Sequence, residues 1–292
     1  MTHVVCVGDL MADVLALLPG PLARGTDTPA TVRILGGGAA ANAAAWVAAA
    51  GGVATFVGRV GDDELGRQAV AQLEQAGVDA RVEADPDRPT GTCIVLVDPS
   101  GERTMVPSAG ANAAAFDPEL LPEHADWLLL SGYSLLRDES RASALAVLTL
   151  GRERGWAIAV DAASAGPLHE VGAESFLDRL GTGIVLLANG AEARVLTGEV
   201  DPAAAARTLA RRLGAAVVKI GSGGAVWSDA RRVCSIPAMP AEVVDTTGAG
   251  DAFAAGFLTA SGSGASRLMR ALHCARHAVA QAGGRPMLPV SG

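Results

Sequence analysis

The sequence predicts an α/β fold in which helices flank a central, mostly parallel sheet, with a small antiparallel sheet attached to it. Short apolar runs alternate with segments of helical length through the second half of the chain, as in parallel sheets. Two segments in which apolar and polar residues alternate flank the turn Asp98–Gly101 and indicate an early hairpin. This hairpin does not belong to the repeat of strands and helices. At 292 residues the chain can bury a large core. We therefore expect one α/β domain over residues 1–292.

The chain up to Pro107 supplies two strand–helix alternations and the hairpin. Glycines and a Pro/Gly/Thr-rich turn over Gly20–Thr31 separate these elements. In chain order we expect a strand at His3–Val7, a helix at Ala39–Ala50, a strand at Val53–Val57, a helix at Glu64–Ala76, and hairpin strands at Cys93–Val97 and Arg103–Pro107.

The second half repeats strand and helix. We expect strands at Trp127–Leu130, Ala157–Val160, Ile184–Leu187 and Ala216–Ile220, separated by helices near Glu139–Arg154, Ala191–Thr197 and Pro202–Leu213. In such sheets ligands gather beyond the carboxyl ends of the strands. Three strand ends carry chemically useful residues, and the sequence predicts that they converge on one crevice: Asp9 and Asp13, Asn189 and Glu192, and Gly221–Gly224.

Composition excludes several classes of protein. The formal net charge is −8, which argues against a nucleic-acid-binding surface, although backbone N–H groups can still bind a phosphate. Four scattered cysteines with no close pair argue against structural zinc and a disulfide framework. The apolar run Ala39–Gly52 is too short and too interrupted to span a bilayer, and the N-terminus does not resemble a signal peptide. We expect a cytoplasmic protein that binds neither membrane nor nucleic acid.

The segment Val244–Phe253 is the most informative part of the chain. Gly248, Ala249 and Gly250 precede Asp251 where a loop becomes an apolar helix. A helix start presents unpaired N–H groups and partial positive charge, and glycine lets an anion approach them. A carboxylate there suggests a base that activates a hydroxyl toward a phosphoryl group. The alternative is a tight turn with an acidic first-turn residue, but a second glycine-rich helix start at Gly36–Asn42 favours two ligands that meet.

These segments resemble the PfkB/ribokinase family of sugar kinases along nearly the whole chain. The resemblance rests on six segments in order, Gly8–Asp13, Leu35–Gly52, Gly58–Gly66, Ala188–Gly198, Lys219–Trp227 and Val244–Phe257, of which the last is close to diagnostic. It implies a ribokinase-like fold, with a small β-sheet lid formed here by segments at about 12–35 and 91–107. It also implies transfer of the γ-phosphoryl group of ATP to a hydroxyl, usually a hydroxymethyl group, of a sugar or nucleoside.

The family motif assigns the chemistry to the Val244–Phe253 segment. Asp251 matches the catalytic base, and Gly248, Ala249 and Gly250 with the Asp251 amide match the anion hole. Asp245 and Thr247 fit a monovalent-cation site that is common in the family, so K⁺ is an optional cofactor beside ATP and Mg²⁺.

The resemblance places the acceptor near the first strand and the first helix. Asp13 matches the aspartate that accepts hydrogen bonds from sugar hydroxyls, and Gly37, Gly38 and Asn42 match the sugar-contacting segment. Tyr133 lies where ribokinases carry an acidic sugar ligand, so it weakens ribose as the substrate. Its ring could stack on a sugar or base, or be core. Asp13 as a turn cap and the glycines as helix packing remain alternatives.

The nucleotide side falls on three further motifs. Asn189 and Glu192 match an element near the triphosphate and Mg²⁺, where Glu192 is expected to act through water; a helix-start pair is the alternative. Gly221, Ser222 and Gly224 match the nucleotide-binding loop, and a solvated Lys219 is expected at its start. His273 lies where the family contacts the base, with His277 one turn later, although a packing role is an equal alternative.

The sequence therefore predicts a Mg·ATP-dependent kinase of a neutral sugar. A nucleoside kinase is the nearest alternative, and a non-catalytic sugar or nucleotide sensor is the alternative from another class. A phosphosugar kinase is a minority interpretation, because the candidate cations Arg33 and Arg103 both fall on expected lid strands. A dinucleotide dehydrogenase is excluded because no G-x-x-G follows Gly8. The lid can also form a homodimer interface, with Leu15, Leu17, Ile94 and Leu96 as apolar contacts or as its inner face.

Overall fold

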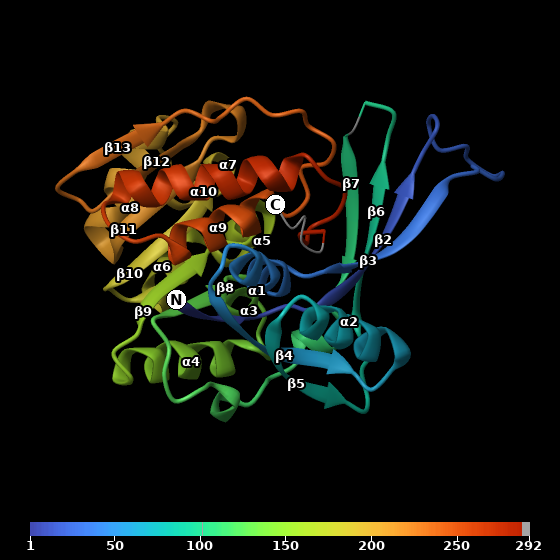
Figure 1. Ribbon diagram of the computed structural model, residues 1–292, viewed down its shortest axis with the longest axis horizontal. Helices are drawn as coiled ribbons and strands as arrows, with labels where there is room; N and C mark the ends of the chain where they lie inside the picture. Colours follow the sequence, from blue (N-terminus) through green and yellow to red (C-terminus); the bar gives the residue numbers. More distant parts are fainter. Residues whose placement is uncertain (101, 288–292) are drawn as a thin grey trace.

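A nine-stranded sheet forms the centre of the molecule in the computed structural model, which describes residues 1–100 and 102–287 (Figure 1). The strand order is β13-β12-β11-β10-β9-β8-β1-β4-β5, and every pair from β11 to β5 is parallel. The parallel strands are β1 (His3–Val7), β4 (Val53–Gly61), β5 (Val78–Asp85), β8 (Trp127–Ser131), β9 (Ala157–Asp161), β10 (Ile184–Asn189) and β11 (Gly214–Lys219). Antiparallel β12 (Ala225–Ser228) and β13 (Val233–Ile236) extend one edge.

Ten α-helices are described, and they cover the two faces of the large sheet. Because strand side chains alternate, Val4 and Cys6 pack toward one helical layer while Val5 and Val7 pack toward the other. The first layer is α1 (Ala39–Ala49), α2 (Glu64–Gln75), α9 (Ala249–Thr259) and α10 (Gly264–Val279). The second is α3 (Tyr133–Leu136), α4 (Arg141–Glu153), α5 (Ala165–Val171), α6 (Ala173–Leu180), α7 (Gly190–Thr197) and α8 (Pro202–Leu213).

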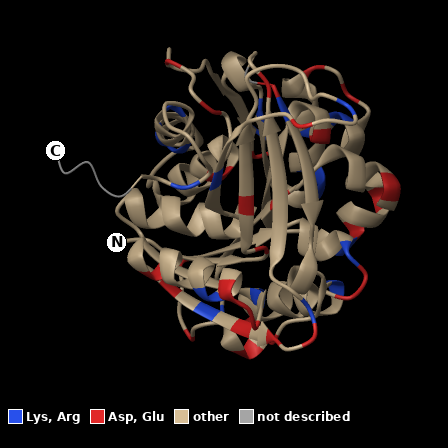
Figure 2. Ribbon diagram, turned by 90° about the vertical axis from the view of Figure 1, so that its right-hand side faces the viewer, with Lys and Arg blue, Asp and Glu red and all other residues tan. Residues whose placement is uncertain are grey.

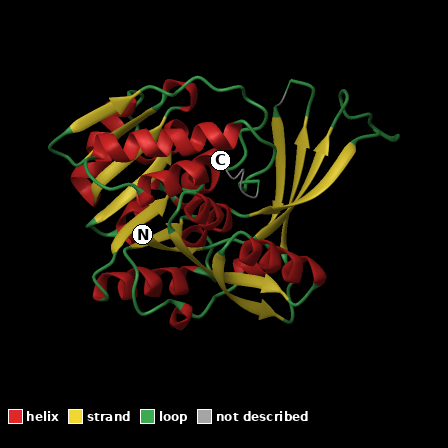
Figure 3. Ribbon diagram, viewed as in Figure 1, coloured by secondary structure: helices red, strands yellow, loops and turns green. Residues whose placement is uncertain are grey.

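A four-stranded sheet stands off one side of this body (Figure 3). Its strands, in the order β3-β2-β6-β7, are β3 (Thr31–Gly37), β2 (Met11–Leu17), β6 (Gly91–Val97) and β7 (Arg103–Ser108). The hairpin β6–β7 is antiparallel as predicted, but the small sheet is mixed rather than purely antiparallel, because β2 and β6 run parallel. These two strands lie far apart in the sequence, so no hairpin signal could report their pairing.

The predicted α/β architecture is confirmed, although the structure contains several elements that were not predicted. The predicted strands and helices of both halves are present with small shifts of their ends, for example Gly214–Lys219 in place of Ala216–Ile220. The prediction does not include the strands β5, β12 and β13 or the helices α3, α5 and α6. Charged residues of both signs are mixed and lie mainly on helices and loops, while the strands facing the viewer in Figure 2 carry few of them. Within the described part of the chain, none of the helices combines the length and apolar character needed to cross a bilayer.

Alanine and glycine allow the helices of the first layer to approach closely. The residues Ala40–Trp46 of α1 are buried, and α1 packs against α9, whose buried residues include Ala252, Ala254 and Gly256. A Cβ added to Gly256 would lie 2.7 Å from the Arg270 carbonyl oxygen of α10, so α10 can approach this closely only because the residue is glycine. This packing brings the N-terminal ends of α1 and α9, with Asn42 and Asp251, to the same place.

Candidate active site

The start of α9 presents its first backbone amides toward a cavity. Gly248 is the N-cap residue, with φ of 73°, and a Cβ there would lie 2.2 Å from the Gly284 carbonyl oxygen. Both the dihedral angle and the space therefore require glycine. Ala249 and Gly250 line the cavity. The first turn of a helix leaves N–H groups unpaired and carries partial positive charge, so an anion can bind at this point.

Asp251 lies one turn into α9 and keeps part of its surface exposed. Its Oδ2 atom accepts a hydrogen bond of 3.0 Å from the Asn42 side-chain amide at the start of α1. Burial and the nearby Asp161 carboxylate raise the pKa of Asp251 to about 7, against the opposing effects of Asn42 and Lys219. A carboxylate with this pKa is well suited to take a proton near neutral pH.

A charged pair lies beside the predicted anion hole. The Lys219 Nζ atom at the end of β11 donates to Asp161 Oδ2 at 3.0 Å, and a Cβ on Gly250 would lie only 3.3 Å from that ammonium group. The expectation that Lys219 is solvated is wrong, because its side chain is only 16% exposed. Burial acts to lower the pKa of Lys219, but Asp161 and Glu192 raise it above its ordinary value. The lysine is therefore charged next to the predicted anion site.

Asp13 lies on β2, on the face of the small sheet that is turned toward the body. Its side chain is buried against Gly37, where a Cβ would lie 2.1 Å from Asp13 Oδ1. Burial raises the pKa of Asp13 to about 6, with Arg285 opposing this shift. No described residue donates a hydrogen bond to this carboxylate, whereas Asp9 is held by Arg137 through two hydrogen bonds of 2.7 Å. Asp13 thus retains acceptor capacity, and Asp9 is a structural partner.

Tyr133 lies at the first position of α3, and the Arg137 guanidinium stacks 5.3 Å from its ring centroid. Its side chain is partly buried, and burial raises the pKa of its hydroxyl despite a hydrogen bond with Ser164. Both Asp9 and Asp161 contribute to that shift, so the ring lies among the charged groups of the crevice.

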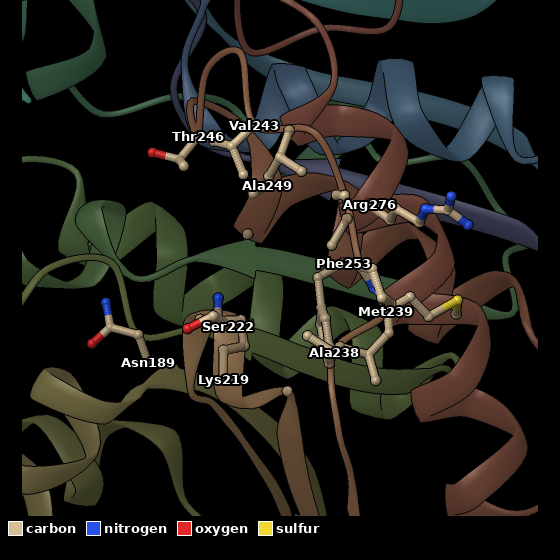
Figure 4. A pocket seen from close by; sticks show the side chains of 18 residues that line it. Asn189, Lys219, Ser222, Ala238, Met239, Val243, Thr246, Ala249, Phe253 and Arg276 are labelled. Carbon is tan, nitrogen blue, oxygen red and sulfur yellow. The ribbon is translucent and has the colours of Figure 1, made fainter. Parts of the chain in front are cut away.

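A cavity of about 780 Å³ opens in front of the α9 start (Figure 4). Four residues predicted from two separate motifs line this cavity together with Gly250 of the predicted anion hole: Asn189, Gly221, Ser222 and Gly224. The remaining wall is largely apolar and includes Phe253, Leu272 and the segment Ala238–Ala241. A flat apolar wall opposite a polar, glycine-rich loop suits a nucleotide base and its phosphates.

His273 does not reach this cavity. The helix α10 contributes Leu272, Ala275, Arg276 and Val279 to the lining, which is one helical face, and His273 lies on the exposed surface. The Nε2 atoms of His273 and His277 are 3.1 Å apart on that surface. The geometry therefore offers Leu272 and Arg276, rather than His273, as contacts for a base.

Asn189 and Glu192 form a complete capping box at the start of α7. The Asn189 side chain accepts from the Glu192 N–H at 2.9 Å, and Glu192 Oε2 accepts from the Asn189 N–H at 2.7 Å. The helix-start alternative is thus present in the structure. Burial and Asp161 raise the pKa of Glu192, which lies close to Lys219 as well. Among the described residues no three His, Cys, Asp or Glu side chains cluster as a metal cage.

Asp245 and Thr247 are held by contacts from three directions. Asp245 Oδ1 accepts from the Thr247 N–H and hydroxyl, and Oδ2 accepts from the Gly283 N–H at 2.8 Å. Arg103 of β7 donates to the Thr247 hydroxyl and lies 3.5 Å from Asp245 Oδ1. Burial acts to raise the pKa of Asp245, but the hydrogen bonds from Gly283 and Thr247 hold that pKa below its ordinary value. Arg103 thus joins the small sheet to the loop before α9.

The sequence reasoning missed Asp161, Arg137, Arg285 and the loop Ala238–Ala241. The first three act through partners that are distant in sequence, and nothing in their local sequence marks them. The apolar period Leu272, Ala275, Val279 on α10 could have identified the cavity-facing side and separated it from His273.

Comparisons with known proteins identify the family and the fold of the chain. The pfkB family carbohydrate kinase model matches residues 1–290. A fructokinase of Klebsiella pneumoniae is 33% identical over 261 residues, covering 86% of this chain and 82% of the relative. The structure of adenosine kinase from Sinorhizobium meliloti superposes with a TM-score of 0.87 at 26% identity over 98% of this chain and 96% of the other. A fructokinase of Vibrio cholerae O395 with fructose, ADP and calcium bound gives a TM-score of 0.81 at 25% identity, over 99% of this chain and 96% of the other.

A carboxylate at a glycine-rich helix start, a neighbouring cavity of about 780 Å³ and a family match along residues 1–290 lead to one assignment. The chain belongs to the pfkB family of carbohydrate kinases, and it is a sugar kinase with the ribokinase-like fold.

Proposed function

We propose that the protein transfers the γ-phosphoryl group of ATP to a hydroxymethyl group of a small sugar, with Asp251 as the general base. The observation that carries this proposal is that Asp251 lies in the first turn of α9, accepts a hydrogen bond from Asn42, and is near Asp13, whose carboxylate receives no hydrogen bond from a described residue. Asp251 takes the proton of the acceptor hydroxyl as its oxygen attacks phosphorus and the bond to the ADP oxygen breaks. The Gly248, Ala249, Gly250 and Asp251 amides stabilise the charge on the transferred group.

The acceptor would lie against Asp13, Gly37, Gly38 and Asn42. Asp13 has no hydrogen-bond donor among the described residues, so two adjacent sugar hydroxyls could donate to its two oxygens. The Asn42 amide already contacts Asp251, and this places any sugar that it binds next to the base. Tyr133 would limit the far side of the acceptor through its ring.

ATP would occupy the cavity of Figure 4, with its base against Leu272 and Phe253 and its phosphates along Gly221, Ser222 and Gly224. Lys219 adds a fixed positive charge beside the transferred group. The donor set fits Mg²⁺ held mostly by phosphates and water. Glu192 is hydrogen-bonded to Asn189, and no cluster of three His, Cys, Asp or Glu side chains that could hold a metal occurs in the described part of the chain. When bound, Mg²⁺ would neutralise charge on the phosphates, with Glu192 acting through water.

Nucleoside kinase is the second candidate, favoured by the likeness to adenosine kinase and by the aromatic side chain of Tyr133. A non-catalytic sensor is the candidate from another class. A sensor needs no general base, so it would not account for a carboxylate with a pKa near 7 at the start of α9. An ADP-release screen with Mg·ATP over ribose, fructose, ketodeoxy-sugars, inositol and nucleosides separates the three. We expect release with one or more sugars. Release with nucleosides alone supports the second candidate, and tight binding without any release supports the sensor.

The monovalent-cation site at Asp245 and Thr247 gives a prediction about K⁺. Arg103 already brings positive charge to both residues, so a K⁺ ion would have to share them with the guanidinium. We expect K⁺ to activate the Arg103→Met variant more strongly than the wild-type enzyme. Steady-state rates in KCl against equal NaCl test this, with Arg33→Met on exposed β3 as the matched control. Equal K⁺ responses in wild type and Arg103→Met would contradict it.

We also propose a homodimer through the small sheet. The outer face carries exposed Val32, Ile34, Ile94 and Val106. Ile94 pairs with Val106, and Ile34 and Ile94 both pair with Val14 from opposite sides, whereas Leu15 is buried on the opposite face. Exposed apolar patches of this kind mark interaction sites. We expect wild type to sediment as a dimer and Ile34→Glu as a monomer in analytical ultracentrifugation. A wild-type monomer at micromolar concentration would contradict the proposal.

A further inference from the structure

Arg285, in the loop that follows α10, connects three parts of the active site. Its Nε atom donates to Asn42 Oδ1 at 3.3 Å and its Nη2 atom donates to the Gly37 carbonyl oxygen at 3.0 Å. The other end of the same Asn42 amide, Nδ2, donates to Asp251 Oδ2 at 3.0 Å. A continuous chain of hydrogen bonds thus runs from the guanidinium through one side-chain amide to the catalytic carboxylate.

The guanidinium settles the orientation of that amide. An amide group can present either its oxygen or its NH₂ to a neighbour, and only the NH₂ stabilises a carboxylate. Arginine has donors and no acceptor, so it binds the amide oxygen and leaves the NH₂ for Asp251. A hydroxyl or a water in place of Arg285 could accept as well as donate, and would not impose this orientation.

The surroundings fix the guanidinium in place. Its Nη1 atom is buried and packs on Gly36 of β3. A Cβ on residue 36 would lie 2.3 Å from Nη1, so the guanidinium fits against this strand only because residue 36 is glycine. The loop itself is held by the Trp46 indole, which donates to the Gly284 carbonyl oxygen at 3.0 Å, and by Gln281, which donates to the Arg285 carbonyl oxygen at 2.8 Å. No carboxylate lies within ion-pair distance of Arg285 in the described part of the chain, so its bonds to the amide and the backbone are its polar contacts.

We propose that Arg285 is a positioning residue that orients the Asn42 amide toward Asp251 and thereby keeps the catalytic base ionisable near neutral pH. This rests on the proposed kinase function of Asp251. The other charged groups that face Asp251 come from β9, β11 and β2, namely Asp161, Lys219 and Asp13, and none of them contacts Asn42. The buried Cys6 thiol on β1 also lies near Asp251, and burial raises its pKa so far that it stays neutral.

Two independent variants remove this effect. Arg285→Met deletes the donors, and Gly36→Ala displaces the guanidinium by placing a methyl group where Nη1 lies. Gly20→Ala is the matched control, because a Cβ on Gly20 meets nothing within 4 Å. Should Arg285→Met fail to fold, Gly36→Ala carries the test, since the displaced group is the end of a flexible side chain.

The first readout needs no acceptor. Infrared titration of the Asp251 carboxyl, isolated as the difference from Asp251→Asn, should place its pKa higher in both variants than in wild type by about one unit, the size expected when a carboxylate loses one hydrogen bond. Gly20→Ala should match wild type. An unchanged Asp251 titration in Arg285→Met and Gly36→Ala would overturn the proposal, even if the enzyme proved to have no kinase activity.

A double-mutant cycle then tests the route through Asn42. In the Asn42→Ala background, adding Arg285→Met should cause no further shift in the Asp251 titration or in the acid limb of kcat/KM. A shift of equal size in both backgrounds would mean that Arg285 acts on Asp251 through space, and this would overturn the positioning role. Absence of phosphotransfer by wild type on all acceptors, with the infrared shift intact, would refute the kinase proposal and not this one.

Discussion

Replacing Asp251 with asparagine is expected to lower kcat by at least about 10²-fold while ATP and sugar still bind. The substitution keeps the shape of the side chain and its contact with Asn42, but removes the group that takes the acceptor proton. Steady-state kinetics at saturating substrates measure the loss, and isothermal titration calorimetry with a non-hydrolysable ATP analogue measures binding. Wild-type turnover in the variant would refute the assignment of the base.

The same variant should be more stable than wild type at pH 8. The folded-state pKa of Asp251, about 7, lies above that of an unfolded aspartate, so the native state holds a proton that the unfolded state has lost. The free energy of unfolding therefore falls as pH rises from about 4 to 7, and the loss persists above pH 7. Asparagine removes this penalty. Thermal denaturation at pH 5 and pH 8 should show the gain of Asp251→Asn mainly at pH 8; a lower Tm at pH 8 would indicate that the variant is damaged.

Lys219→Met is expected to cost both stability and activity. The lysine is the only described ammonium group near Asp161, Glu192 and Asp251, and its loss leaves these carboxylates without compensation. Breaking a buried ion pair costs about 3–5 kcal/mol, and the lower end applies because Lys219 and Asp161 keep 16% and 19% exposure. The acid limb of the pH–rate profile should also move to higher pH, because Lys219 opposes the raised pKa of Asp251.

Chemical denaturation and the pH–rate profile test this variant, with Arg88→Met as the control. Arg88 pairs with Glu139 at 2.7 Å on the surface, so its removal should change neither quantity appreciably. The double variant Asp161→Asn/Lys219→Met should recover part of the lost stability, because it removes the orphaned charge as well. A fully stable Lys219→Met variant with an unshifted profile would show that the pair is not coupled to the base.

Local sequence was sufficient for the parts of the site that depend on helix starts and glycine loops. Gly248–Asp251, Gly221–Gly224 and the pair Asn189 and Glu192 each owe their shape to neighbours within a few residues. Members of all three segments, such as Gly250, Ser222 and Asn189, line one cavity. The same holds for most strands, whose apolar runs are continuous. Strands β12 and β13 have only 4 residues each and β13 is partly exposed, so neither gives a long apolar run in the sequence.

The charged partners could not be read from the sequence, because each pairing crosses much of the chain. Lys219 and Asp161 are 58 residues apart, Arg137 and Asp9 are 128 apart, and Arg285 and Asn42 are 243 apart. A lysine at a strand end is ordinarily solvated, and only the three-dimensional arrangement reveals its buried partner. The sequence placed His273 at the cavity, but its neighbour Leu272 is the residue that lines it. Consecutive residues on a helix point about 100° apart, so an error of one position is enough to choose the wrong side chain.

The most direct measurement is ³¹P NMR of the products formed from Mg·ATP and a mixture of sugars by wild type and Asp251→Asn. The account predicts a new phosphomonoester signal that grows together with ADP in the wild-type reaction and is nearly absent with the variant. Inorganic phosphate alone, or a phosphomonoester formed equally by both proteins, would contradict it.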